Sequence, residues 1–438
     1  MSDWHDDTLS NIADIRTSNV DKKSYEGEIP VRLCNYMDVY SRDYITQDID
    51  FMEGTATPAE IARFGIARGD VMLTKDSETP DDIGIPAAVV DAIPELVCGY
   101  HLALLRPRAD RVDSVYLAKQ LASSETARRF ARLASGSTRY GLSYAAIAST
   151  PVRLRPLPQQ RRIAEILSTV DEAIEQTEKL IAKHQQIKSG LMNDLFTRGL
   201  TPDGRLRPPH NEAPHLYKDS PLGPIPKEWE IHRVKAQGSV KLGRQRAPRF
   251  ETRSSGTPYL RVANVFDGWI DYSDVYSMFF SKSEQVEYSL IAGDILLNEG
   301  QSKELVGRSA KYAGPPNAFC FQNTLIRFRP NERALSDYFQ AVFKCYLDRG
   351  WFAAVAHQTT SVAHLGANRF ARMFIPKPSQ NEALQISWAL HQAQVSIDGQ
   401  TEGAQKLRLL RCGLMHDLLT GNVPAVNGSK GFESGGSQ

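Results

Sequence analysis

Two short stretches of the chain come closest to residue patterns that perform chemistry. Asp21-Lys22-Lys23 has the acid-x-Lys letters with which a metal-dependent nuclease holds a cation and orients water, but it lies in a polar stretch rather than on a strand. Gly314-Pro315-Pro316-Asn317 is the nearest approach to the Asn/Asp-Pro-Pro-Tyr/Phe signature of enzymes that methylate amino groups of DNA, and it lacks both end residues. Neither stretch supports catalysis.

Other catalytic and cofactor-binding patterns are missing from the sequence. It contains no G-x-x-x-x-G-K-[ST] phosphate loop, no G-x-G-x-x-G dinucleotide turn, no H-E-x-x-H metal helix and no G-x-S-x-G nucleophile elbow. His210 and His215 have only Glu212 nearby, which is a poor metal site. We therefore expect no catalytic residue, no metal and no cofactor in this chain, which would recognise or organise while another protein performs the chemistry.

Composition bounds the class of protein. The 438 residues are too many for one ordinary core, so two or three domains are expected. The sequence has no run of about eighteen apolar residues, and MSDWHDDTLS at the N-terminus lacks the apolar core of a signal peptide. We therefore expect a cytoplasmic protein with no membrane partner. Its net charge of +1 neither demands nor excludes nucleic acid. The cysteines are scattered without a C-x-x-C pair, which is typical of a reduced protein without structural zinc: Cys34, Cys98, Cys320, Cys345 and Cys412.

The chain repeats one phrase at about half its own length. Residues 188–199 read KSGLMNDLFTRG, and residues 411–422 read RCGLMHDLLTGN, 223 positions later. Further pairs keep the same order at similar offsets, and we interpret them as a tandem duplication of a globular unit followed by a helix. The pairs are IAEILSTVDEAIEQ (163–176) with ISWALHQAQVSIDG (386–399), ASGSTRYGLS (134–143) with AHQTTSVAHL (356–365), RGDVML (68–73) with AGDILL (292–297), and RLCNYMD (32–38) with RVANVFD (261–267).

Each globular unit has a mixed α and β pattern. Short apolar runs such as VMLTK, HLALLRPR, DILLN and NTLIRFRP indicate strands. Gly69-Asp70 and Gly293-Asp294 are expected to form tight turns before a strand. Residues 114–135 and 335–356 have the apolar spacing of one helix each.

Two helices of about forty residues follow the globular units. From Ile163 the apolar positions step by four and three, which is a heptad seam that includes His184 as a seam residue rather than a ligand. We expect the two helices to pack antiparallel as a coiled coil, with Gly399 and Gly403 interrupting the second at about 1 kcal/mol each. The residues predicted for helix packing and partner docking are Ile163, Leu167, Val170, Ile174, Ile181, Leu191, Met192, Leu195, Ile386, Leu390, Ile397, Leu407, Leu414, Met415 and Leu418.

The sequence resembles the specificity (S) subunits of type I restriction–modification systems along nearly its whole length. The carriers are RPLPQQRRIAEILSTVDEAIEQTEKLIAKHQQIKSGLMNDLFTRGLTPDGRLR, then YKDSPLGPIPKEWE, and the second helix ending in GLMHDLLTGNV. The resemblance implies an α+β fold with two tandem target-recognition domains, separated by two long antiparallel helices with pseudo-two-fold symmetry. The predicted segments are a first target-recognition domain (1–155), a first conserved helix (156–200), a Pro/Gly-rich linker (201–226), a second target-recognition domain (227–377), a second conserved helix (378–424) and a disordered tail (425–438).

The resemblance also implies a function and partners. Such a subunit is not an enzyme, and each recognition domain reads one half of a bipartite, asymmetric site on double-stranded DNA. Two methyltransferase (modification) subunits and two motor-nuclease (restriction) subunits would bind it, and S-adenosylmethionine, ATP and Mg²⁺ would be held by those partners. About 35 helical residues span roughly 50 Å, so half-sites about one DNA turn apart are expected.

The loops that repeat in position but differ in chemistry are the candidates for DNA contact. Base edges need donors and acceptors such as Arg, Lys, Asn and Gln, whereas phosphates also accept from hydroxyl groups. For each loop the alternative is a plain structural role, and for Arg32, Asn35, Arg261 and Asn264 the two stand level. The candidates are Arg32, Asn35, Lys75, Ser77, Ser137, Thr138, Arg139 and Tyr140 in the first copy, and Arg261, Asn264, Gln301, Ser302, Lys303, Gln358, Thr359, Thr360 and Ser361 in the second.

Three other interpretations of the whole chain stay open. It could be a fragment of a fused restriction–methylation enzyme. It could also be a coiled-coil scaffold that does not touch DNA, or the specificity subunit of a related restriction system of another type.

Overall fold

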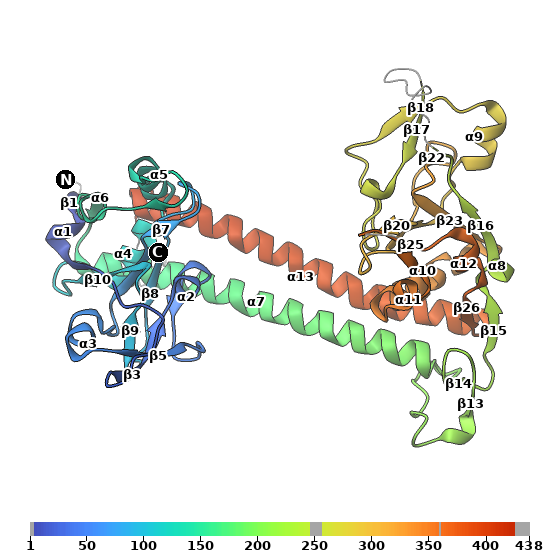
Figure 1. The fold of residues 1–438 in the computed structure, drawn as a ribbon, viewed down its shortest axis with the longest axis horizontal. Coiled ribbons are helices and arrows are strands. Elements are labelled where there is room, and N and C mark those ends of the chain that lie inside the picture. The colour runs from blue at the N-terminus through green and yellow to red at the C-terminus, as the bar shows by residue number, and fades with distance from the viewer. Residues whose placement is uncertain (1–3, 246–255, 359–360, 425–438) are drawn as a thin grey trace, which may run out of the picture. The chain divides into compact units, whose positions relative to one another are not determined.

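The computed structural model describes residues 4–245, 256–358 and 361–424. They form two compact units (Figure 1): unit 1 contains residues 1–178 and 402–438, and unit 2 contains residues 179–401. Both long helices pass from one unit into the other, so each unit owns half of each helix. The predicted boundaries instead fell at the helix ends. Thr359, Thr360 and the predicted tail, residues 425–438, lie outside the described residues.

The long helices are α7 (Leu157–Thr197) and α13 (Gln380–Thr420), close to the predicted bounds. They run antiparallel within each unit: Glu178 pairs with Arg408 in unit 1, and His184 lies 3.3 Å from Ser396 in unit 2. The predicted interruption of the second helix was wrong, because α13 is continuous through Gly399 and Gly403. A Cβ at either glycine would meet nothing within 4 Å, and a loss of about 1 kcal/mol per glycine is small beside the packing of a 41-residue helix.

Unit 1 contains a five-stranded sheet, ordered β2-β10-β6-β8-β4, beside a three-stranded sheet, ordered β5-β3-β9. Its strands are β1 (His5–Thr8), β2 (Ala13–Thr17), β3 (Ile29–Cys34), β4 (Tyr44–Ile45), β5 (Met52–Ala56), β6 (Val71–Thr74), β7 (Asp76–Ser77), β8 (Pro86–Val89), β9 (Leu96–Cys98), β10 (Leu102–Pro107), β11 (Tyr140–Gly141) and β12 (Pro151–Leu154). Its short helices are α1 (Leu9–Ile12), α2 (Tyr36–Tyr40), α3 (Pro58–Phe64), α4 (Ser114–Leu121), α5 (Ser124–Leu133) and α6 (Tyr144–Ala148).

Unit 2 repeats this topology without a counterpart of β4: one sheet is ordered β16-β23-β19-β21 and the other β18-β17-β22. Its strands are β13 (Tyr217–Lys218), β14 (Ile225–Pro226), β15 (Glu230–Arg233), β16 (Gly238–Leu242), β17 (Thr257–Leu260), β18 (Tyr276–Met278), β19 (Ile295–Asn298), β20 (Gly300–Gln301), β21 (Ser309–Lys311), β22 (Cys320–Phe321), β23 (Leu325–Pro330), β24 (His357–Gln358), β25 (Ala363–His364) and β26 (Phe374–Lys377). Its short helices are η1 (Pro214–Leu216), α8 (Val234–Gln237), η3 (Val262–Asn264), α9 (Lys282–Tyr288), η4 (Arg333–Leu335), α10 (Ser336–Asp348), α11 (Trp351–Val355) and α12 (Ala367–Arg372).

The duplication is visible in these strand pairings. β3 pairs in parallel with β9 in unit 1, and β17 pairs in parallel with β22 in unit 2. The first and last strands of each recognition domain also pair, β1 with β12 and β15 with β26. Two tandem mixed α/β domains separated by long helices are therefore the architecture, as predicted.

Both predicted 22-residue helices are broken in two. Ser123 caps the start of α5, where its hydroxyl accepts from the backbone N–H of Thr126 at 3.3 Å. Gly350 ends the path of α10 because it adopts φ +69°, a left-handed conformation that a helix interior does not allow. A capping serine and a left-handed glycine outweigh an apolar pattern that runs across them.

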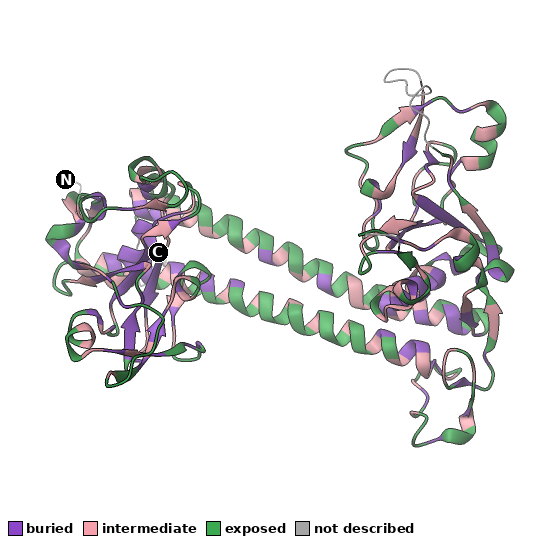
Figure 2. Cartoon of the chain, viewed as in Figure 1, coloured by how far each residue is buried: buried purple, intermediate pink, exposed green. Residues whose placement is uncertain are grey.

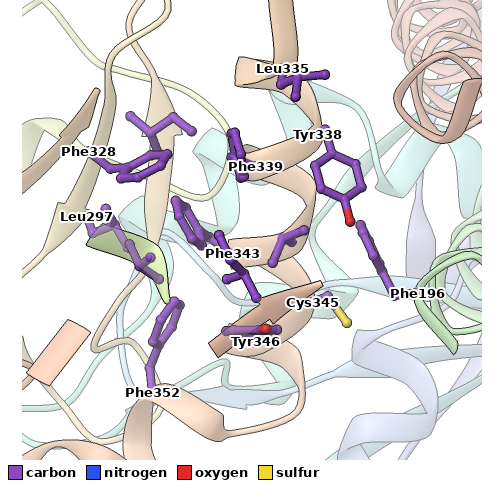
Figure 3. Packing of buried hydrophobic residues seen from close by; sticks show 14 of the residues in the cluster. Phe196, Leu297, Phe328, Leu335, Tyr338, Phe339, Phe343, Cys345, Tyr346 and Phe352 are labelled. Atoms are coloured by element: carbon purple, nitrogen blue, oxygen red, sulfur yellow. The ribbon is translucent and has the colours of Figure 1, made fainter. Parts of the chain in front are cut away.

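The long helices complete the cores of both units. Leu418 and Leu419 of α13 join the core of unit 1, next to Ile163 and Leu167 of α7. In unit 2, Phe196 of α7 contacts Tyr338 of α10, with ring centroids 5.8 Å apart (Figure 3). Figure 2 shows the same pattern along the helices: buried positions gather near the ends, and the middles are largely exposed.

The predicted linker packs against unit 2. Arg207 and Tyr217 of the linker are buried, and Trp229, just after the linker, is fully buried. The Arg207 guanidinium lies 2.6 Å from the carboxylate of Glu382, in the first turn of α13. The Pro and Gly content therefore predicted the absence of regular structure but not this packing.

Within the described part of the chain, no helix is both long and apolar enough to cross a membrane.

Candidate nucleic-acid interface

The Gly-Asp turns are structural, as predicted, and the two copies are built alike. Gly69 and Gly293 both have φ +93°, which favours glycine. The carboxylate of Asp70 accepts two hydrogen bonds from Arg106, at 2.8 and 2.7 Å. Asp294 accepts two from Arg329, both at 2.7 Å. Each bidentate pair fixes the turn to the neighbouring strand, so the loop after each buried strand starts from a rigid position.

In unit 1, two of the predicted DNA-contact loops are brought together by one short ladder. β7 pairs with β11, which sets Ser77 opposite Tyr140 and Asp76 opposite Gly141. Ser137, Thr138 and Arg139 are exposed beside this ladder, whereas Ser77 is buried, so Ser77 positions the loop in this structure. Lys75 Nζ lies 5.8 Å from the ring centroid of Tyr100. This part of unit 1 thus gathers hydroxyl, cationic and aromatic groups on one set of loops.

The corresponding loops of unit 2 also meet. Strand β25 pairs on one side with β20 and on the other with β24, so Gln301 and Gln358 both lie opposite Ala363. Ser302 and Lys303 follow Gln301 directly. Gln358 and Ser361 are exposed on either side of Thr359 and Thr360, which lie outside the described residues. In each unit, the fold therefore places side by side two loops that the sequence comparison selected as candidates for DNA contact.

The remaining four candidates lie in the turns that follow β3 and β17. The backbone N–H of Asn35 donates to the carboxylate of Asp38 at 2.7 Å, and that of Arg261 donates to the Asn264 amide oxygen at 3.0 Å. The strand registers thus align Asn35 with Arg261, three residues away from the pairing assumed in the sequence comparison.

The structure favours the structural interpretation for part of this set. Asn264 is buried and its amide nitrogen donates to the backbone oxygens of Asp271 and Asp274, each at 3.0 Å. Arg32 is half-buried on β3, where its backbone pairs with β5 and β9. Arg261 forms an ion pair with Asp274 and lies over the ring of Tyr276, 4.2 Å from its centroid.

An aromatic segment beside these loops was not predicted. In unit 1, burial raises the pKa of Tyr36, and a hydrogen bond with Ser77 and the charge of Arg139 oppose that rise. Tyr36 stacks on Tyr40, and Phe266 stacks on Trp269 in unit 2. The signal that could have found this segment is the presence of aromatic residues shortly after the capped turn in both copies.

A groove in unit 1 has the opposite chemistry. It holds about 950 Å³ between residues 40–50 and the two long helices. Its carboxylates outnumber its arginines, so it does not suit DNA phosphates: Asp43, Asp48, Asp50, Asp171, Glu172, Glu175 and Glu178 face only Arg42, Arg408 and Arg411. This groove therefore repels nucleic acid, unlike the loops described above.

The predicted helix-seam residues are packing residues. Nine of them are buried within their own units, including Ile163, Leu167, Ile386 and Leu390. Val170, Ile181, Leu191, Leu407, Leu414 and Met415 are half-buried.

No group of three or more His, Cys, Asp or Glu side chains suited to a metal ion occurs within residues 4–245, 256–358 and 361–424.

Known proteins are similar to this chain in sequence and in fold. Residues 1–185 match the family model described as the type I restriction modification DNA specificity domain. A Methanocaldococcus jannaschii protein, named as the MjaX specificity subunit of a type I restriction enzyme, is 25% identical over 209 residues. The match covers 47% of this chain and 49% of that protein, so the chain spans about half the length of this curated relative.

Two solved structures are similar over almost the whole chain. The type I restriction-modification S subunit from M. genitalium is 14% identical with a TM-score of 0.54, covering 95% of this chain and 96% of that one. A chain from a structure on complex assembly and conformational transition of the type I restriction–modification system is 16% identical with a TM-score of 0.58, covering 96% and 98%. Residues 1–185 are therefore similar to the type I restriction modification DNA specificity domain family, and the chain as a whole shares the fold of the solved type I S subunit.

Proposed function

We propose that the chain is the DNA sequence-recognition subunit of a type I restriction–modification complex and is itself non-catalytic. The observation that carries the proposal is one topology present twice, with different side chains on equivalent loops. Arg139 and Lys75 occupy these loops in unit 1, whereas Gln301, Lys303 and Gln358 occupy them in unit 2. Two recognition domains with the same topology but different surface side chains suit a bipartite, asymmetric target on double-stranded DNA.

The duplication also supports two copies of a partner. Each unit contributes the first half of one long helix and the second half of the other, so equivalent helix pairs occur twice. Each helix pair would bind one modification subunit, and two motor-nuclease subunits would join the complex. S-adenosylmethionine, ATP and Mg²⁺ would be held by those partners. The helices would set half-sites about one DNA turn apart, near 34 Å.

The test of this function is the adenine methylome of the host, read by single-molecule sequencing with and without the gene. We expect loss of N6-methyladenine at one interrupted, asymmetric motif when the gene is deleted. Exchanging residues 1–155 for those of another subunit should change one half of the motif and leave the other half intact. If no motif disappears on deletion, the chain does not direct methylation. That result would favour the interpretation of the chain as a coiled-coil scaffold that does not touch DNA.

Partner docking predicts a measurable role for Trp388 on α13. Leu384, Trp388 and Val395 are 41, 67 and 49% exposed. Their spacing places them on one helix face, opposite the buried Ile386 and Leu390. An exposed tryptophan between aliphatic side chains is the usual composition of an interface centre, where truncation costs about 2 kcal/mol or more.

We therefore expect Trp388→Ala to weaken binding of the modification subunit by about 30-fold, measured by titration calorimetry with the purified subunits. The control is Val286→Ala on α9, which removes an 80% exposed apolar side chain from the recognition domain of the same unit. Equal affinities for Trp388→Ala and the unaltered chain would place the docking surface elsewhere.

A further inference from the structure

Each unit carries a stacked pair of aromatic rings beside its candidate DNA-contact loops. In unit 2 the rings of Phe266 and Trp269 have centroids 4.4 Å apart and planes 10° apart, and Trp269 is 54% exposed. In unit 1 the rings of Tyr36 and Tyr40 have centroids 5.3 Å apart and planes 19° apart. Each copy thus has a stacked aromatic pair after its capped turn, although the two pairs occupy different positions of the repeat.

The segment that carries Trp269 is held firmly. Its backbone closes on itself, since the N–H of Phe266 donates to the oxygen of Trp269 at 3.0 Å. The N–H of Gly268 donates to the oxygen of Ser309 at 2.9 Å, and the amide of Asn298 donates to the oxygen of Val265 at 3.2 Å. A ring presented by such a turn has little conformational entropy to lose when it binds a ligand.

The ring pair shares a surface with the candidate loop at residues 301–303. The guanidinium carbon of Arg308 lies 4.9 Å from the ring centroid of Phe266. Arg308 closes the loop that starts at Ser302, because its backbone N–H donates to Leu305 and that of Leu305 donates to Ser302. Arg308 thus connects the turn that carries Phe266 and Trp269 to the loop that follows Gln301.

Unit 1 places its pair in the same relation to its own loops. Burial raises the pKa of Tyr36, whereas the neighbouring Ser77 and Arg139 lower it. The hydroxyl of Tyr40 donates to Asp82 at 2.7 Å, in the loop that follows Ser77. The pair thus lies against the loop after the Gly-Asp strand in both units.

Charge near the unit 2 pair decides which part of DNA it would meet. Asp267 and Asp274 are exposed beside it, although Lys344 pairs with Asp267 at 2.9 Å and Arg261 pairs with Asp274. Carboxylates repel phosphates, so a phosphate contact at Trp269 is disfavoured. A flat apolar ring instead suits the apolar feature of the major groove, the 5-methyl group of thymine.

We propose that Trp269 is a specificity-determining residue of the second recognition domain and contacts a thymine methyl group in its half-site. The inference rests on the proposed function, because it requires that this domain reads DNA. The stacked pair of unit 1, Tyr36 and Tyr40, carries hydroxyl groups and lies at other positions of the repeat. The two half-sites would therefore differ at this contact.

The test compares adenine methylomes of hosts carrying the unaltered chain, Trp269→Ala, Trp269→Phe and Val286→Ala. We expect Trp269→Ala to make one position of one half-site degenerate, with the other half-site unchanged. Trp269→Phe should keep that position, since it retains a flat apolar ring, and Val286→Ala should keep the whole motif. A thermal melt of each purified chain establishes that the variants fold.

A binding measurement on the assembled complex identifies the methyl group. Duplexes carry deoxyuridine in place of each thymidine of the half-site in turn, which removes only the methyl. One such substitution should weaken the unaltered complex by about tenfold, within the range for single base contacts, and should not affect the Trp269→Ala complex.

The outcomes separate the two proposals. An unchanged motif in Trp269→Ala, while gene deletion still erases it, overturns this inference and leaves the function standing. Uniform loss of methylation by a folded Trp269→Ala chain overturns it too, because that indicates general affinity. Equal binding to every deoxyuridine duplex overturns the methyl assignment. If gene deletion leaves the methylome unaltered, the proposed function itself is wrong.

Discussion

Replacing Asp171 with asparagine is expected to lower the free energy of unfolding of unit 1 by about 3 kcal/mol or more. Asp171 on α7 and Lys119 on α4 have side chains only 7 and 5% exposed, and their charged groups lie 2.6 Å apart. The hydroxyl of Tyr44 also donates to Asp171, at 2.7 Å, and Arg411 of α13 lies 3.3 Å away. Removing the carboxylate leaves the buried ammonium of Lys119 with Asp43 as its carboxylate partner, which is 3.2 Å away and 42% exposed.

Chemical unfolding of the full chain, followed by circular dichroism, measures this loss. The double variant Lys119→Met with Asp171→Leu is the informative comparison, because apolar replacement of a whole buried ion pair is often neutral. We expect the double variant to be markedly more stable than Asp171→Asn. Equal stability of Asp171→Asn and the unaltered chain would mean that Lys119 finds solvent or another partner.

Unit 2 has a different charge at the repeat position of Asp171. Lys344 and Asp267 pair at 2.9 Å in unit 2, with side chains 31 and 45% exposed. Lys188 of α7 corresponds to Arg411, and Gln394 of α13 corresponds to Asp171 at the repeat offset. Burial and the charge of Lys344 lower the pKa of Lys188, which hydrogen-bonds with Gln394. The carboxylate present in unit 1 is thus replaced by a neutral amide in unit 2.

The second large effect is expected for Glu382→Ala, which should destabilise unit 2 by about 3–5 kcal/mol. Glu382 and Arg207 have side chains 8 and 9% exposed, with contacts of 2.6 and 3.4 Å between them. Glu382 also accepts from the backbone N–H of Leu200 at 2.7 Å, just after the end of α7. The variant therefore leaves a buried guanidinium and a buried N–H without their acceptor.

A matched control lies on the same arginine. Glu228 approaches Arg207 at 3.8 Å, but its side chain is 64% exposed. Exposed pairs contribute between about 0 and 1 kcal/mol, so Glu228→Ala should change the denaturation midpoint little. Comparable losses for Glu228→Ala and Glu382→Ala would contradict the assignment of stability to the buried pair.

Sequence periodicity predicted the parts of the fold that depend on local pattern. The strands at 71–74, 102–107, 295–298 and 325–330 follow from short apolar runs, and both long helices follow from heptad spacing. The breaks at Ser123 and Gly350 did not follow, because single capping or left-handed residues override periodicity. The offset comparison also misplaced Arg261 by three residues, since the loop lengths before β3 and β17 differ.

The candidate site was predictable in its loops and not in its contacts. Repeat comparison identified the stretches around Lys75, Arg139, Gln301 and Gln358, and two short ladders bring them together. The stacked aromatic pairs escaped notice because burial, not residue type, separates Trp269 from a core aromatic such as Tyr259. Ion pairs joining residues 119, 171 and 411 were likewise invisible, because they depend on tertiary packing.

The exchange of helix halves between the units has a consequence for synthesis on the ribosome. Leu418 and Leu419 fill the core of unit 1, so that core stays open until the last helix has been translated. Unit 2 needs from α7 only Met192, Leu195, Phe196 and their neighbours, all made before its own recognition domain. Although domains usually fold in order of translation, here the domain that is made first is finished last. A nascent chain halted before residue 402 would thus carry a completed second unit and an exposed apolar core in the first.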